Sequence, residues 1–180
     1  VNDRRQIIPS YYIEDTYTPL TRHTYNVAMH SVGVALHGAK KILQDPHVRV
    51  YSLCRPPGHH AEEKAMGGYC YFNNASVAAE LLSEKGKVAI LDLDYHHGNG
   101  TQQAFYTRND VMYVSLHANP ESAYPYSTGF EDERGEGDGV GYNINIPLNT
   151  SVDDRGYLQA LDKAMAKIRE FEPDFVVVSM

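Results

Sequence analysis

The stretch Val88-Ala-Ile-Leu-Asp-Leu-Asp-Tyr-His-His-Gly-Asn-Gly-Thr101 decides how the rest of this chain can fold. Residues 88–93 are an apolar run interrupted by Asp92, a pattern typical of a buried parallel strand. If the extended backbone continues, the side chains of Asp92, Asp94 and His96 project to the same side. Two carboxylates and an imidazole at the end of a buried strand are poorly solvated unless a cation lies among them. The stretch therefore predicts a divalent metal site, with zinc as the first candidate.

Apolar periodicity divides the chain into alternating helices and strands. Thr24, Asn73 and Thr101 are expected to cap helices, and Asp153-Asp154 are expected to open the helix that follows them. Strands are expected at 48–53, 88–93, 111–117, 142–147 and 175–178. Helices are expected at 74–85, 101–106 and 155–171, and a first helix is expected between its cap at Thr24 and the break at Asp45-Pro46. This order predicts an α/β domain with a mainly parallel sheet.

Two segments show no period. Residues 1–23 contain prolines and a tyrosine cluster, and they are expected to form a surface loop or an oligomer contact. Residues 118–139 are expected to form a loop, which at that length is usually functional or mobile.

Composition limits the class of protein. The chain has 180 residues, 42% of them hydrophobic, which suits one domain with a substantial core. A formal charge of −7 without a basic face argues against nucleic-acid binding. Two cysteines cannot form a disulfide framework, so a reducing cytoplasm is expected, and no run is long enough for a membrane span. We expect a single domain over residues 1–180, truncated at both ends, because the last apolar strand runs directly to Met180.

A second polar group follows the expected strand at 48–53. His59 and His60 lie in a loop that two prolines and a glycine make rigid, at the edge where parallel α/β folds place their sites. Metal-assisted hydrolysis needs a general base for water and a general acid for the leaving amine. Paired histidines can supply both functions, and Asp92 and Asn99 are near enough in sequence to orient them.

Three motifs resemble the zinc-dependent histone deacetylase family. They are Arg55-Pro-Pro-Gly-His-His-Ala-Glu62, Gly67-Gly-Tyr-Cys-Tyr-Phe-Asn73 and Asp92-Leu-Asp-Tyr-His-His-Gly-Asn-Gly-Thr101. Within the family, they are most similar to the bacterial acetylpolyamine amidohydrolases and histone deacetylase-like amidohydrolases. The resemblance implies a three-layer arginase/deacetylase-like α/β fold, with a mainly parallel central sheet flanked by helices, of which this chain would be a fragment.

The resemblance also implies a metal centre. Asp94 and His96 would ligate one zinc ion per active site. The family's third ligand, an Asp in a Ser-x-Gly-x-Asp-like segment, would follow Met180, and the oxyanion-stabilising Tyr would lie further on. Because catalytic zinc sites use three protein ligands plus water, the two ligands present would not suffice by themselves.

The catalytic histidines implied by the resemblance are His59 and His60. Asp92 would support His59, and Asn99 would support His60. Some members of the family have Asp where Asn99 stands, and the neutral amide should favour the uncharged form of His60.

The remaining implied residues bind substrate and cation. Gly68, Tyr69 and Tyr124 match the channel that grips the aliphatic stem of the substrate. A monovalent-cation site that usually holds potassium is implied at Asp92, Asp94, His96, Ser115 and Leu116.

The function expected from the resemblance is removal of acetyl groups from acetylated amines. N-acetylpolyamines are favoured over acetyl-lysine by the closer motif match, the negative net charge and the acidic segment 131–138. Alternatives are a protein acetyl-lysine deacetylase and a catalytically silent module that binds acetylated ligands. The partner would be a small cationic acetylated amine or acetyl-lysine, with a homodimer possible and neither nucleic acid nor membrane involved.

Two other hydrolase classes fit poorly. An arginase-type binuclear manganese enzyme would need Asp-x-His-x-Asp motifs, which are absent. A phosphatase using Asp-x-Asp would need Thr or Val two residues after the second Asp, where this chain has His96.

Overall fold

A parallel β-sheet forms the centre of the molecule. The computed structural model describes residues 9–180, and residues 1–8, with that part of the expected loop, lie outside the described range. The sheet has the strand order β3-β2-β1-β4, and every neighbouring pair runs parallel. The strands are β1 (Val88–Asp92), β2 (Val111–Ala118), β3 (Asn143–Leu148) and β4 (Phe175–Ser179). This confirms the predicted α/β class.

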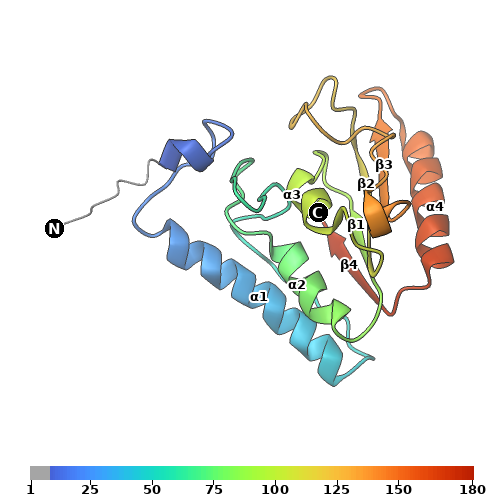
Figure 1. Ribbon diagram of the computed structural model, residues 1–180, viewed down its shortest axis with the longest axis horizontal. Helices are drawn as coiled ribbons and strands as arrows, with labels where there is room; N and C mark the ends of the chain where they lie inside the picture. The colour runs from blue at the N-terminus through green and yellow to red at the C-terminus, as the bar shows by residue number, and fades with distance from the viewer. Residues whose placement is uncertain (1–8) are drawn as a thin grey trace.

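Helices cover both faces of the sheet (Figure 1). On one face α2 packs against β1 and β4, with α1 lying outside it, while α4 packs against β2 and β3 on the other face. The helices are α1 (Thr24–Gln44), α2 (Asn74–Ser83), α3 (Asn99–Phe105) and α4 (Asp154–Phe171), with 3₁₀ turns η1 (Pro9–Tyr12) and η2 (Gly137–Gly139). None of the helices in residues 9–180 is long and apolar enough to cross a membrane.

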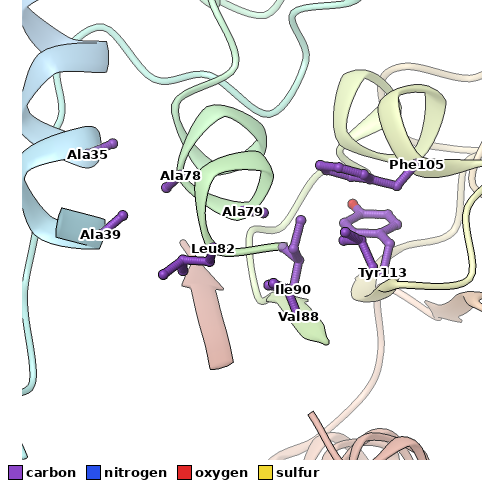
Figure 2. Close-up of a cluster of buried hydrophobic side chains, with 10 residues drawn as sticks. Ala35, Ala39, Ala78, Ala79, Leu82, Val88, Ile90, Phe105 and Tyr113 are labelled. Carbon is purple, nitrogen blue, oxygen red and sulfur yellow. The ribbon is translucent and has the colours of Figure 1, made fainter. Parts of the chain in front are cut away.

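Each face of the sheet has its own core. Figure 2 shows the first, where small residues of α1 and α2 let the two helices approach each other over β1. The second lies under α4 and contains Leu116, Ala164 and Ile168. Because β1 and β2 contribute to both cores, all their residues are buried, as the apolar runs in the sequence predict.

Helix caps were predicted with mixed success. Asn73 accepts a hydrogen bond from the backbone N–H of Ser76, and Asp153 accepts one from Gly156, so both cap helices as expected. The capping role predicted for Thr24 is wrong, because α1 begins at that residue after His23. Thr101 does not cap either, since α3 already begins at Asn99 and the Thr101 hydroxyl accepts from the side chain of Asn73.

The predicted strand at 48–53 is also wrong. The segment is outside every strand of residues 9–180 and runs beside α1, where a β-carbon on Gly38 would meet Ser52 Oγ at 2.6 Å. Tyr51 and Leu53 are 72% and 77% exposed. An apolar segment becomes a strand only where a neighbouring strand can accept its backbone hydrogen bonds, and no strand within residues 9–180 pairs with it.

Candidate active site

Asp92 ends β1 and is fully buried beneath the site. Its Oδ2 accepts hydrogen bonds from His59 Nδ1 at 3.0 Å and from the hydroxyl of Tyr113 at 3.1 Å. Its Oδ1 accepts from the backbone N–H of Asp94 at 3.2 Å. These three donors satisfy a carboxylate that would otherwise be costly to bury. Because a carboxylate only accepts, the proton of neutral His59 is on Nδ1, and Nε2 faces the site.

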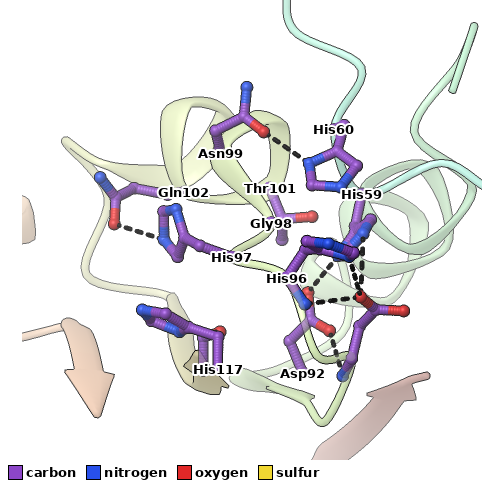
Figure 3. A network of polar contacts seen from close by, with 12 residues as sticks. His59, His60, Asp92, His96, His97, Gly98, Asn99, Thr101, Gln102 and His117 are labelled. Atoms are coloured by element: carbon purple, nitrogen blue, oxygen red, sulfur yellow. Dashed lines mark hydrogen bonds and ion pairs between the residues drawn. The ribbon is translucent and has the colours of Figure 1, made fainter. Parts of the chain in front are cut away.

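His60 lies beside His59, with ring centroids 4.0 Å apart (Figure 3). His60 Nδ1 is 2.8 Å from Asn99 Oδ1, at the first turn of α3. Burial and the neighbouring His59 lower the pKa of His60 to about 3, so its ring is neutral near pH 7. For His59, burial alone would lower the pKa, but the charge and hydrogen bond of Asp92, with the charge of Asp94, raise it. The two rings therefore have different proton affinities.

Asp94 and His96 lie on the solvent side of the histidine pair. The extended backbone expected past Asp92 does not persist, because β1 ends there and the chain bends. The bend still brings the groups together: Asp94 Oδ1 is 3.5 Å from His96 Nδ1 and 3.7 Å from His59 Nε2. Asp94 Oδ1 also accepts from the backbone N–H of His96 at 2.8 Å, which holds the bend.

This donor set suits part of a zinc site. One carboxylate oxygen and one imidazole nitrogen, 35% and 43% exposed as side chains, are ligand types that zinc takes and are open to an incoming ion. Within residues 9–180, no group of three or more His, Cys, Asp or Glu side chains is arranged to hold a metal ion. Asp94 and His96 therefore fit two positions of a zinc site and leave the third protein ligand to be supplied.

Gly68 and Tyr69 form a tight turn against His60. Both have positive φ, +54° and +67°, and Tyr69 is 58% exposed. The backbone N–H of Gly68 donates to Asp15 Oδ2, and that of Tyr69 donates to Thr18 Oγ1 at 3.0 Å. Asp15 and Thr18 thus fix the turn, a role that the irregular sequence before residue 23 did not reveal.

Tyr124 comes from the loop after β2 and packs against His60 beside the glycine turn, where a β-carbon on Gly67 would meet the Tyr124 hydroxyl at 2.6 Å. Its ring meets His60 edge-on, with centroids 4.8 Å apart, and meets His96 at 6.2 Å. The structure therefore brings Gly68 and Tyr124 together around His60, and Tyr69 extends the same turn into solvent.

Ser115 and Leu116, the predicted cation-site residues, are buried in β2. Ser115 pairs with Asp92 across β1 and β2, which places it at the end of β1, next to the carboxylate that holds His59. The Ser115 hydroxyl lies 2.8 Å from His117 Nδ1, and His117 Nε2 lies 2.8 Å from the carbonyl of Gly129. These contacts connect the strand end with the loop 118–139.

A further buried network, missed in the sequence, anchors that loop. Gln102 in α3 donates through Nε2 to Thr128 Oγ1 and to Glu133 Oε2, while its Oε1 lies 3.1 Å from His97 Nε2. Glu133 also accepts from the backbone N–H groups of Gly129 and Phe130. The loop is therefore tied to α3 instead of being free. No sequence pattern predicted these contacts, because the partners of Gln102 lie 26 and 31 residues away.

Comparisons with known proteins identify the family. The Histone deacetylase domain model matches residues 2–180. Acetylpolyamine amidohydrolase 2 of Pseudomonas aeruginosa is 46% identical over 172 residues, covering 94% of this chain and 50% of that protein. Histone deacetylase 9 of Homo sapiens is 39% identical over 165 residues, covering 87% of this chain and 16% of that protein.

A solved structure shows the same fold. The crystal structure of acetylpolyamine aminohydrolase from Burkholderia pseudomallei superposes with a TM-score of 0.91 at 44% identity, covering 94% of this chain and 49% of that chain. The chain therefore belongs to the histone deacetylase family and has its three-layer α/β fold, as the resemblance implied. It spans about half the length of the acetylpolyamine amidohydrolases it matches.

Proposed function

We propose that the whole protein is a zinc-dependent amide hydrolase that removes acetyl groups from N-acetylpolyamines. The observation that carries this proposal is the pair His59 and His60, each held by a side-chain acceptor and placed beside Asp94 and His96. Two imidazoles with different proton affinities next to open oxygen and nitrogen ligands are what metal-assisted amide hydrolysis requires.

Asp94 and His96 would hold the zinc ion, together with a third ligand from residues outside 1–180. When bound, zinc would supply Lewis-acid polarisation of the substrate carbonyl and of the attacking water. The backbone N–H of His96 donates to Asp94 Oδ1, which keeps this carboxylate oriented before the ion binds.

His60 is the proposed general base. Its Nδ1 faces Asn99 and its burial keeps the ring neutral, so the Nε2 lone pair can accept a proton from the attacking water. His59 is the proposed general acid, because the carboxylate of Asp92 stabilises its charged form and the ring can then donate from Nε2 to the leaving amine nitrogen.

The substrate proposed is an acetyl group on a slender alkyl amine that carries a second positive charge. Burial and the charges of Asp15, Glu14 and Glu62 raise the pKa of Tyr124, so a negative field reaches the ring that packs on His60. The net charge of −7 adds to this field. A cationic amine tail would be attracted to it, and the attraction should weaken as salt rises.

An acetyl-lysine side chain is the second candidate, supported by the 39% identity to a protein named histone deacetylase 9. The kcat/KM values of the full-length enzyme for acetylputrescine, acetylspermidine and an acetyl-lysine peptide distinguish the two candidate substrates. We expect the polyamines to be preferred. A preference of about tenfold or more for the peptide would overturn the proposal that N-acetylpolyamines are the substrate. Binding of these compounds without turnover of any of them would indicate a catalytically silent binding module.

A monovalent-cation site near Ser115 is also proposed. Its support is the pairing of Ser115 with Asp92, which places β2 carbonyls and hydroxyls beside the carboxylate that holds His59. Activity of the full-length enzyme titrated with potassium, at constant ionic strength with a tetraalkylammonium salt as the balance, tests it. Activity that does not change with potassium would contradict the site.

A further inference from the structure

Glu62 contacts the side chain that orients His60. Its Oε1 accepts a hydrogen bond from Asn99 Nδ2 at 2.7 Å, while Asn99 Oδ1 faces His60 Nδ1 at 2.8 Å. Figure 3 shows the Asn99 oxygen turned toward His60 and its nitrogen on the far side. Asn99 is buried at 4% exposure, so solvent does not compete for either end of its amide.

The chemistry of these groups sets the direction of every hydrogen bond. An amide can present either its oxygen or its nitrogen to a neighbour, so Asn99 by itself would accept from His60 or donate to it. A carboxylate only accepts, and Glu62 therefore requires the Asn99 nitrogen on its side. The oxygen must then face His60, and His60 must carry its proton on Nδ1. The lone pair remains on Nε2.

Glu62 is itself held in place by Gln103. The backbone N–H of Glu63 donates to Gln103 Oε1 at 2.9 Å, which turns the Gln103 nitrogen toward Glu62. That nitrogen donates to Glu62 Oε2 at 2.9 Å. A backbone N–H can only donate, so the order of donors and acceptors is defined from Glu63 through Gln103, Glu62 and Asn99 to His60.

We propose that Glu62 is a positioning residue that sets the tautomer of His60 by fixing the orientation of the Asn99 amide. The catalytic consequence rests on the proposed function, in which His60 Nε2 accepts the proton of the attacking water. The tautomer itself does not depend on that function and can be measured separately.

The isosteric change Glu62→Gln tests the proposal. Gln103 still presents its nitrogen, so Gln at position 62 turns its oxygen toward Gln103 and its nitrogen toward Asn99. Asn99 must then turn its oxygen away from His60 and donate to His60 Nδ1, which moves the proton to Nε2. We expect kcat to fall about tenfold or more, with KM changed by less than about threefold, because the base is altered and the channel is not.

A second substitution should restore the tautomer. In Glu62→Gln with Asn99→Asp, the new carboxylate accepts both from Gln at position 62 and from His60 Nδ1. We expect the double variant to recover most of the lost kcat. Asn99→Asp alone places two carboxylates in contact, so it should lose activity. Two harmful single changes that compensate each other are not expected from a merely structural Glu62.

The direct readout is ¹⁵N NMR of the histidine ring in the zinc-loaded full-length protein. His60 should carry its proton on Nδ1 in the unaltered protein and in the double variant, and on Nε2 in Glu62→Gln. Glu63→Gln is the matched control, because Glu63 is exposed and only its backbone N–H contributes. An unchanged tautomer in folded Glu62→Gln would overturn the proposal whatever the activity. A changed tautomer with unchanged kcat would uphold the positioning role and overturn His60 as the base.

Discussion

A β-carbon on Gly68 would lie 2.1 Å from Cδ2 of His60. The backbone at Gly68 therefore lies so close to His60, the proposed base, that a side chain at this position would displace the imidazole ring. The same turn is held from behind by Asp15 and Thr18, so it cannot retreat without losing both hydrogen bonds. Gly68 is thus part of what keeps His60 next to His59.

Gly68→Ala should lower activity more than stability. The added methyl group must push His60 away, and displacement of a catalytic group by about 1 Å can cost on the order of 10²-fold in rate. Gly137→Ala is a matched control, since Gly137 has a similar φ of +56° against +54° but an added β-carbon would meet nothing within 4 Å. Both variants should melt at lower temperature because of backbone strain, while only Gly68→Ala should lose kcat. Equal kcat in the two variants would contradict this account.

Asp94→Ala should remove zinc and abolish hydrolysis in the full-length protein. The remaining imidazole of His96 would lose its carboxylate neighbour, and a catalytic zinc site needs three protein ligands. Elemental analysis of the purified variant measures the zinc directly. The control Asp162→Ala removes an exposed aspartate of α4 and should retain the metal. Stoichiometric zinc in Asp94→Ala would exclude Asp94 as a ligand.

His60→Ala should cost about 10²-fold or more in kcat while leaving zinc content intact, because in the proposed mechanism the ring acts as a base and not as a ligand. Zinc content and kcat are measured on the same preparation. His30→Ala, an exposed histidine of α1, serves as the control. If His60→Ala turns over substrate nearly as fast as the unaltered enzyme, His59 and not His60 is the general base. If the pair shares the proton transfer, the two single losses will not add in the double variant.

Much of the fold could be predicted from local patterns. The strands β1 and β3 could be predicted from their own residues. A strand buried on both faces is a continuous apolar run, as at 88–92, and a strand buried on one face alternates apolar and polar residues, as around β3. The segment 48–53 shows the limit of this reasoning. Its residues suit a strand, but whether a strand forms depends on a neighbour that accepts its hydrogen bonds, and no local pattern reports that neighbour.

The site follows the same division. His59, His60, Asp92 and Asn99 lie within recognisable motifs, and the family resemblance of those motifs implied that they meet, although the strand expected before His59 does not form. Glu62 is the last residue of one of the three motifs, but its partner Asn99 is 37 residues away. Their contact depends on how α3 packs beside the loop that carries Glu62, which the sequence does not show. Asp15 supports Gly68 across 53 residues from a segment with no period. Such contacts arise from the tertiary fold alone.

Cys70 should resist alkylation in the folded protein. Its side chain is completely buried, and burial, with the nearby charges of Asp94 and Asp92, raises the pKa of the thiol to about 12. Since only the thiolate reacts, a rise from 9.0 to about 12 lowers the reactive fraction at pH 8 roughly 10³-fold, before steric exclusion is counted.

The measurement is peptide mapping by mass spectrometry after a short iodoacetamide pulse, with and without urea. The Cys70 peptide should be modified only when the protein is unfolded, and Cys54, which is partly exposed, should react first. Cys54→Ser provides a control in which no other thiol of residues 9–180 competes for reagent. Rapid labelling of Cys70 in the folded protein would mean that the turn at Gly68 and Tyr69 opens readily. In that case the tight contact between Gly68 and His60 could not hold the base in place.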